Sequence, residues 1–225
     1  MKSWIILFSI DLLLYYFISF RVGAIAFVLV FLKILWDVGL FTPIKFSNGQ
    51  FKHSEIYYIC YTGEYMNVGK EFAKINEIFK KFNLDKYVYN SIGIYYDDPK
   101  KMTDKSKCRA VLGICKDSSD FHRNKSVNQP LEEYLRENNF RKAEIPDTNC
   151  LRVTFPYVNM ISMLIGIKKF YKALNSNLSD ENFKRSFRVD SKKISCTVEI
   201  YAENEMVFYV PLQNNEKFNL HTKSE

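Results

Sequence analysis

The first 36 residues constrain this chain most, because they are apolar almost throughout. The charged residues among them are Lys2, Asp11, Arg21 and Lys33. A helix needs roughly 20 apolar residues to cross the hydrocarbon core of a bilayer, and residues 12–32 reach that length. A core helix of a soluble protein is rarely apolar on every side over such a length. We therefore expect an uncleaved transmembrane anchor over residues 1–36.

Two other interpretations of this segment stay open. A shallow membrane hairpin would carry Arg21 at its tip, where the side chain can reach the headgroups. A cleaved signal peptide would use the small-residue triplet Ala24-Ile25-Ala26, which follows an apolar stretch as cleavage sites do. Cleavage there would leave the apolar residues 27–36 as a new N-terminus, which argues against this interpretation.

The flanks of the anchor predict its orientation. Basic residues prefer the cytosolic side of a membrane span. The C-terminal flank offers Lys33, Lys45 and Lys52 against Asp37. We therefore expect the bulk of the chain to face the cytosol.

Cysteine usage is compatible with that orientation. The chain has five cysteines, an odd number without CxxC spacing, which fits a reducing compartment and predicts neither a disulfide framework nor a zinc site. A lumenal or secreted location is the competing hypothesis. Glycans on the sequons at Asn124 and Asn177 would support it.

The overall composition averages over two different objects. The chain is 47% hydrophobic, which excludes a mainly disordered protein. Its mean hydropathy of −0.20 blends the anchor with a more polar remainder. Residues 37–52 predict a linker, because turn-forming residues punctuate them. Residues 53–213 predict one domain, and residues 214–225 a short polar tail.

The hydrophobic period changes repeatedly within the domain. A first block predicts a strand, an amphipathic helix and two further strands, at 56–61, 68–82, 92–96 and 109–115. A short helix around Pro130 follows. The second block repeats the order at 151–155, 160–174, 196–201 and 206–210. We therefore predict an α+β fold, with an N-terminal transmembrane helix followed by a pseudo-twofold tandem βαββ domain.

Three short motifs carry a family resemblance. They are Ile94-Tyr95-Tyr96-Asp97-Asp98-Pro99 with Lys107-Cys108-Arg109, Thr154-Phe155-Pro156-Tyr157 before an apolar helix, and Glu199-Ile200-Tyr201 in a hairpin that runs to Val210-Pro211-Leu212. Over about residues 88–212 the chain resembles the testis-expressed ER-phagy receptor family. The resemblance implies an N-terminal anchor in the endoplasmic reticulum membrane. It also implies a cytosolic gyrase-inhibitor-like domain, related to the SOUL haem-binding proteins.

This resemblance implies a receptor or adaptor rather than an enzyme. The expected role is selective autophagy of the endoplasmic reticulum, with a second role in DNA–protein crosslink repair at the nuclear envelope through a segregase ATPase. Family members dock on autophagosomal ubiquitin-like proteins through a long acidic tail. Here residues 213–225 follow the last predicted strand, which puts that partner in question.

The sequence offers little catalytic chemistry. It contains no nucleophile elbow, HExxH motif, phosphate-binding loop or dinucleotide fingerprint. His53, His122 and His221 are far apart in the sequence. We therefore predict no enzymatic activity, no metal site and no cofactor.

Glu199 is the most informative single residue. Strand alternation puts Glu199 and Tyr201 on one face, and Val198 and Ile200 on the other. If the aliphatic pair faces the helix, Glu199 and Tyr201 face a cleft, which Tyr209 joins from the partner strand. An acid ringed by tyrosines can bind an organic cation. The alternative function is thus a membrane-tethered module for a small cationic, hydrophobic or haem-like ligand. A half-exposed strand with a solvated Glu199 is the competing interpretation.

A basic cluster lies between the second predicted helix and the last hairpin. Its members are Lys184, Arg185, Arg188, Lys192 and Lys193. The polar composition of residues 179–193 predicts a loop. Close to a membrane anchor, such a surface attracts anionic lipid. Nucleic acid is a second candidate partner, although we expect no specific nucleic-acid binding.

Overall fold

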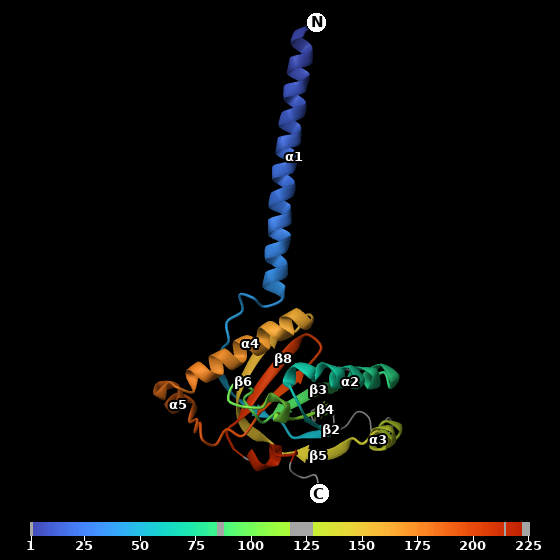
Figure 1. The fold of residues 1–225 in the computed structure, drawn as a ribbon, viewed down its shortest axis with the longest axis vertical. Coiled ribbons are helices and arrows are strands. Elements are labelled where there is room, and N and C mark those ends of the chain that lie inside the picture. The colour runs from blue at the N-terminus through green and yellow to red at the C-terminus, as the bar shows by residue number, and fades with distance from the viewer. Residues whose placement is uncertain (1, 85–87, 118–127, 214, 222–225) are drawn as a thin grey trace.

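The computed structural model describes residues 2–84, 88–117, 128–213 and 215–221. His122 and the sequon at Asn124 lie outside these ranges. Helix α1 (Lys2–Asp37) is a single long helix that projects from the rest of the chain (Figure 1). Its stretch Ser19–Asp37 has a mean hydropathy of 1.9 and is not buried at all, so it could cross a membrane by length and composition. A signal sequence would have the same properties, and the anchor therefore stays a prediction.

One antiparallel sheet of eight strands organises the domain. Its strands are β1 (Ser47–Phe51), β2 (Ser54–Thr62), β3 (Tyr89–Tyr95), β4 (Arg109–Asp117), β5 (Arg141–Ile145), β6 (Thr148–Pro156), β7 (Thr197–Tyr201) and β8 (Glu205–Pro211). Their spatial order is β1-β6-β8-β7-β3-β4-β2-β5. The helices are α2 (Gly69–Lys81), α3 (Asn128–Glu137), α4 (Met160–Asn177) and α5 (Glu181–Phe187). This layout confirms the predicted α+β class.

The sheet has an internal pseudo-twofold symmetry. Exchanging β1 with β5, β2 with β6, β3 with β7 and β4 with β8 reverses the strand order and leaves the sheet unchanged. The register follows the same rule: β1 pairs with β6 and β5 with β2. The axis passes through the central pair of strands, where Gly93 on β3 faces Glu199 on β7. Two units therefore form one continuous sheet, as the repeat in the sequence predicts. Each unit has one more strand than the predicted βαββ order, because β1 and β5 precede β2 and β6.

The two faces of the sheet bury different cores. The helices cover one face, where α2 and α3 pack on the first unit and α4 and α5 on the second. The other face encloses a core that includes Phe51 from one edge strand and Ile145 from the opposite edge strand. Because both edges contribute to a single cluster, the sheet must curl around it. Phe218 and Leu220, near the C-terminus, are almost fully buried in this inner core.

Local sequence explains the two principal helices. In α2, the residues Ile75, Ile78 and Phe79 recur at helical spacing and are buried. Helix α4 begins with a capping box, in which the Asn159 side chain accepts from the Ser162 backbone N–H at 3.0 Å. The Ser162 hydroxyl in turn accepts from the Asn159 backbone N–H at 3.0 Å. This reciprocal pair satisfies helix donors that would otherwise lack partners.

Three segments differ from the sequence-based prediction. The predicted linker 37–52 contains strand β1, which pairs with β6. The predicted polar tail 214–225 contains a 3-10 turn (Asn215–Phe218), whose Phe218 fills the inner core. The predicted loop 179–193 contains helix α5. In each case an isolated apolar side chain, such as Phe218 or Phe183 in α5, finds a tertiary partner that a polar local composition conceals.

The segment after α1 is fixed to the domain by α4. The Lys169 ammonium of α4 donates to the backbone carbonyls of Gly39, Leu40 and Thr42 at 3.1, 2.6 and 2.8 Å. Gly39 has a positive φ of 79° and lies against the Phe155 ring, which leaves no room for a Cβ atom. Gly166 of α4 touches the same ring. The exit of α1 is therefore held on α4 rather than on a free linker.

Candidate functional site

The candidate site lies at the centre of the helix-covered face, where the two units meet. Glu199 stands on β7 opposite Gly93 of β3, and it is only 2% exposed. It points toward the helices, whereas Val198 belongs to the inner core and Ile200 packs against that core. The sequence-based assignment of the faces is therefore reversed: the acid faces the helices and the aliphatic pair faces the curled interior.

Tyrosine hydroxyls satisfy the Glu199 carboxylate. Tyr171 of α4 donates to Oε1 at 3.0 Å, and Tyr201 of β7 donates a short hydrogen bond to Oε2. The Tyr171 hydroxyl also lies 2.7 Å from the Thr197 hydroxyl. The carboxylate thus receives neutral donors from a helix and from its own strand.

The pKa of Glu199 departs far from its ordinary value of 4.5. Burial raises the pKa of Glu199 to about 7, and the hydrogen bonds from Tyr201 and Tyr171 only partly oppose that rise. Within the described residues, the ion pairs that the structure forms do not include Glu199. A buried carboxyl without a basic partner is half ionised near neutral pH and is poised to accept either a proton or a cation.

Further aromatic rings surround the acid. Tyr95, from β3, is buried next to it, and burial followed by the charge of Glu199 raises the pKa of Tyr95 well above its usual range. The Tyr201 ring contacts Phe72 of α2 at 5.3 Å and Tyr157 at 5.8 Å between centroids. The acid is therefore enclosed by tyrosines and covered by rings from α2 and from the turn before α4.

Gly93 makes space for this arrangement. A Cβ atom at this position would lie 2.7 Å from Cε2 of Tyr95 and 2.9 Å from its hydroxyl. The absence of a side chain thus allows the Tyr95 ring to lie over β3, beside the paired Glu199. The position at the pseudo-twofold axis is therefore Glu199 in the second unit and Gly93, which has no side chain, in the first.

The structure brings together two of the three residues predicted for the ligand site. Glu199 and Tyr201 are in direct contact. Tyr209 pairs with Val198 across the hairpin and lies on the opposite face, where its ring packs on Phe51 at 5.4 Å. The inclusion of Tyr209 was wrong, because the register places Phe208, and not Tyr209, across from Glu199.

The site also contains residues that the sequence did not single out. Tyr95 and Tyr171 complete the ring of hydroxyls around Glu199. Their sequence neighbours Tyr96 and Phe170 are also aromatic but point elsewhere, so aromatic character alone does not identify the site residues. The match between Ile94-Tyr95 and Ile200-Tyr201 was the available signal. It marks the symmetric ends of the two central strands, and therefore a shared face.

The predicted basic cluster is distributed over α5 and the turn that follows. Lys184 pairs with Glu181 at 2.7 Å, and Lys193 lies 3.9 Å from Asp190. Arg188 ends α5 in the left-handed conformation. Two of the five basic side chains thus lie beside an acidic partner within the segment, and lipid or nucleic-acid binding there stays a prediction.

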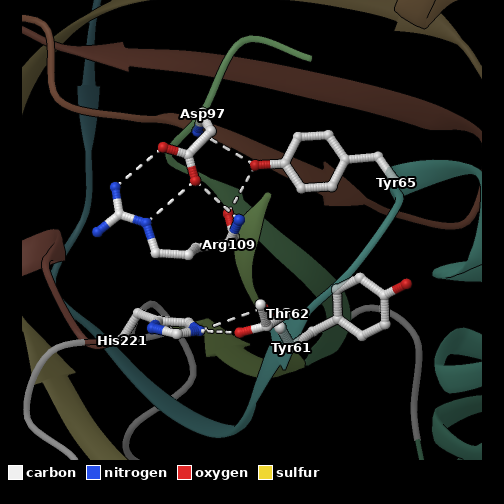
Figure 2. A network of polar contacts seen from close by, with 6 residues as sticks. All are labelled: Tyr61, Thr62, Tyr65, Asp97, Arg109 and His221. Carbon is white, nitrogen blue, oxygen red and sulfur yellow. Dashed lines mark hydrogen bonds and ion pairs between the residues drawn. The ribbon is translucent and has the colours of Figure 1, made fainter. Parts of the chain in front are cut away.

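A second polar network involves Asp97 and Arg109 of the first of the three sequence motifs (Figure 2). The Asp97 carboxylate accepts from Nε and Nη2 of Arg109 at 3.1 and 2.9 Å, and from the Arg109 backbone N–H at 2.8 Å. The Tyr65 hydroxyl donates to the Arg109 carbonyl at 2.6 Å and accepts from the Asp97 backbone N–H at 3.1 Å. Beside this group, Nε2 of His221 lies 3.2 Å from both the Thr62 hydroxyl and the Tyr61 carbonyl. These contacts join the ends of β3 and β4 to each other, and the C-terminal segment to β2.

Metal coordination finds no support in this part of the chain. Among the described residues, no three His, Cys, Asp or Glu side chains gather closely enough to hold a metal ion. His53 instead lies 3.7 Å from Glu144 at the surface, far from the Glu199 site in the fold.

Comparisons with known proteins concern the fold. No protein-family model and no curated protein matches the chain. Among solved structures, the C-terminal domain of EcmrR is similar at 13% identity and a TM-score of 0.42, covering 75% of this chain and 96% of that one. SAV2435 bound to tetraphenylphosphonium is similar at 7% identity and a TM-score of 0.44, covering 79% and 99%. An uncharacterised conserved protein from Listeria innocua is similar at 10% and 0.45, covering 76% and 94%.

At such identities and TM-scores, these likenesses identify neither a family nor a ligand for this chain. The predicted tandem repeat is visible in the strand order, with one further strand, β1 or β5, before each predicted βαββ unit. Membership of the ER-phagy receptor family, with its autophagy and DNA-repair roles, stays a prediction.

Proposed function

We propose that the domain binds a small, lipophilic organic cation at Glu199, and that α1 tethers this binding module to a membrane. The observation that carries the proposal is a buried carboxyl whose partners are hydroxyl groups and whose pKa is raised to about 7. A bound cation would supply the positive counter-charge for the Glu199 carboxylate.

The surroundings of Glu199 favour an organic cation over a metal ion. The nearest groups are the rings and hydroxyls of Tyr95, Tyr171 and Tyr201. Aromatic faces attract a diffuse positive charge, most strongly where water is excluded. A hard metal ion would instead need several carboxylate or carbonyl oxygens, and the cluster supplies a single carboxylate.

Binding requires the aromatic cover to move. Glu199 is 2% exposed, so a ligand must displace the rings of Phe72 or Tyr157 from Tyr201. These rings belong to separate elements, α2 and the turn before α4. Ligand entry between α2 and the start of α4 is therefore the expected route, with the cation exchanged for the proton on Glu199.

The test uses tetraphenylphosphonium as a probe, chosen for its delocalised charge and aromatic faces. The full chain in lipid nanodiscs should show saturable binding and a rise in melting temperature. Glu199→Gln should lower the affinity at least about tenfold, because the amide carries no charge. The matched control is Glu203→Gln, an exposed acid in the turn of the same hairpin, which should bind as wild type does.

Two further ligands sharpen this test. Triphenylphosphine oxide is neutral and tetraphenylborate is an anion of similar shape, and neither should stabilise the protein. Equal stabilisation by all three compounds would indicate an apolar pocket without a role for the carboxyl and would contradict the proposal. Equal affinity of wild type and Glu199→Gln for the cation would contradict it as well.

A further inference from the structure

The outward face of α4 is unusual for a helix that faces water. Its first turns expose Met160, Ile161 and Leu164, and Val158 precedes them; these four side chains, the α4 patch, are between 57% and 71% exposed. Ile161 and Leu164 continue along the same face into Lys168 and Lys172, which are also exposed. The face therefore changes from apolar to basic along its length.

The symmetry-related helix shows what a water-facing surface looks like in this fold. Helix α2 occupies the equivalent place in the first unit. Its outward stripe at the same spacing is Lys70, Lys74, Glu77 and Lys81, all exposed. The apolar patch on α4 is thus a property of one unit and not of the scaffold.

The α4 patch is held in place rather than frayed. The capping box fixes the start of α4, and the Val158 backbone N–H also donates to the Ser162 hydroxyl at 2.8 Å. Ser162 itself is fully buried. Several large apolar side chains are therefore exposed on a rigid turn, an arrangement that marks an interaction surface.

The position of α1 identifies the occupant. Figure 1 shows α1 leaving the domain on the side that α4 covers. Lys169 binds the three carbonyls that follow α1, and Gly39 and Gly166 pack on the same Phe155 ring. Trp36 and Phe41, at the foot of α1, are exposed, with ring centroids 6.3 Å apart. Aromatic residues of this kind favour the membrane–water interface.

We propose that the α4 patch docks on the lipid surface of the bilayer that α1 enters. The apolar side chains would sit among the headgroups, while Lys168 and Lys172 contact anionic lipid. The proposal rests on the membrane anchoring of α1. It adds that the domain has a fixed orientation, with Tyr171, the Glu199 partner on α4, one helix away from lipid.

Single fluorescent labels on the full chain test this orientation. A Cys60→Ser background removes the exposed thiol, since the other four cysteines are buried. A bimane label is then placed at Ile161→Cys or Leu164→Cys. Nanodiscs with one protein copy each contain phosphatidylcholine, phosphatidylserine and a spin-labelled lipid as quencher. We expect spin-labelled lipid to remove most of the emission at both positions.

Two further positions separate the premise from the inference. Val28→Cys in α1 should be quenched if α1 is inserted, and Glu77→Cys on the equivalent face of α2 should keep its emission. Quenching at 28 with an unquenched, water-exposed label at 161 and 164 would overturn the docking and leave the anchor intact. An unquenched label at 28 would overturn the anchor and the docking together. A further preparation uses discs that hold two protein copies. If the label at 161 is shielded only in those discs, the patch docks on a second copy of this chain and not on lipid, which would also overturn the proposal.

Discussion

The two units share a ββαββ scaffold, and three differences between them stand out. Strand pairs β1–β2 and β5–β6 have the same lengths and the same spacing, and the central strands exchange across the axis. On this common frame, the axial position is Gly93 in the first unit and Glu199 in the second. The outward stripe of α2 is polar, whereas that of α4 starts apolar.

The third difference is the connection within each hairpin. Residues 202–204 join β7 to β8 in a tight turn, whereas residues 96–108 join β3 to β4. In the first unit the Asp97–Arg109 pair holds the base of the longer connection (Figure 2). The comparison shows that a shared scaffold carries different side chains in its two units, and the proposed cation site and the proposed lipid-facing surface both use side chains of the second unit.

The largest expected effect tests whether the two units form one cooperative core. Phe170 of α4 is fully buried and stacks on Phe208 at 4.2 Å. Phe170→Ala should lower the free energy of unfolding by about 3–5 kcal/mol, and Ile75→Ala in the equivalent helix α2 by about 2–5 kcal/mol. Both variants should unfold in a single transition when followed by circular dichroism. Separate transitions for the two units would break the comparison.

The next effect concerns the buried acid. Because the pKa of Glu199 is about 7 in the folded chain against an ordinary value of 4.5, the folded state holds its proton more tightly. The contribution of this proton to the free energy of unfolding should therefore be fully present below pH 4.5 and be lost as the pH rises through 7. Glu199→Gln should remove this dependence and raise the free energy of unfolding at pH 8 by about 1–3 kcal/mol. Denaturation midpoints from pH 5 to 8 measure it, and parallel curves for both proteins would contradict it.

Gly93→Ala addresses the partner position across the axis. The new methyl group would meet the Tyr95 ring at 2.7 Å, so we expect a loss of about 1–2 kcal/mol in the free energy of unfolding. Cation affinity should fall too, because Tyr95 lies beside Glu199. Gly69→Ala is the control, since no atom lies within 4 Å of its new methyl group. If Gly93→Ala changed neither the free energy of unfolding nor the cation affinity, the Tyr95 ring would be free to move aside, and the account of this position would be wrong.

The smallest effect tests the clamp of the first hairpin. Hydrogen bonds from Arg109, together with its charge, lower the pKa of Asp97. The stabilisation is therefore present above the usual pKa of an aspartate and is lost as the pH falls toward the lowered value. Asp97→Asn should cost about 1 kcal/mol at pH 7, a modest amount because Arg109 is 44% exposed at its side chain. Chemical denaturation measures this loss, and Asp98→Asn next to it should have a weaker effect.

Periodicity predicted the repeated core because each predicted strand and helix buries one regular face. The pattern of Val68, Phe72 and Ile75 marked α2, and the hairpin around Asn204 is present as predicted. Strands β1 and β5 were missed because Ser47-Asn48-Gly49 and the charged segment Arg141–Ile145 lack local strand character. They are strands because the symmetric partners β6 and β2 offer free edges.

The candidate site could be predicted only in part. Alternation put Glu199 and Tyr201 on one face, which is correct. Which face meets the helices depends on the curl of the whole sheet, and the sequence of β7 contains no sign of it. Tyr171 was beyond reach for the same reason, since its contact with Glu199 joins α4 to a strand more than twenty residues later.

Proton release on cation binding tests the central claim most directly. Calorimetry of tetraphenylphosphonium binding at pH 7, in buffers with different ionisation enthalpies, counts the protons released. Because the pKa of Glu199 is about 7, we predict that wild type releases about half a proton per cation and that Glu199→Gln releases none. Binding without proton release, or equal release by both proteins, would contradict a cation site at Glu199.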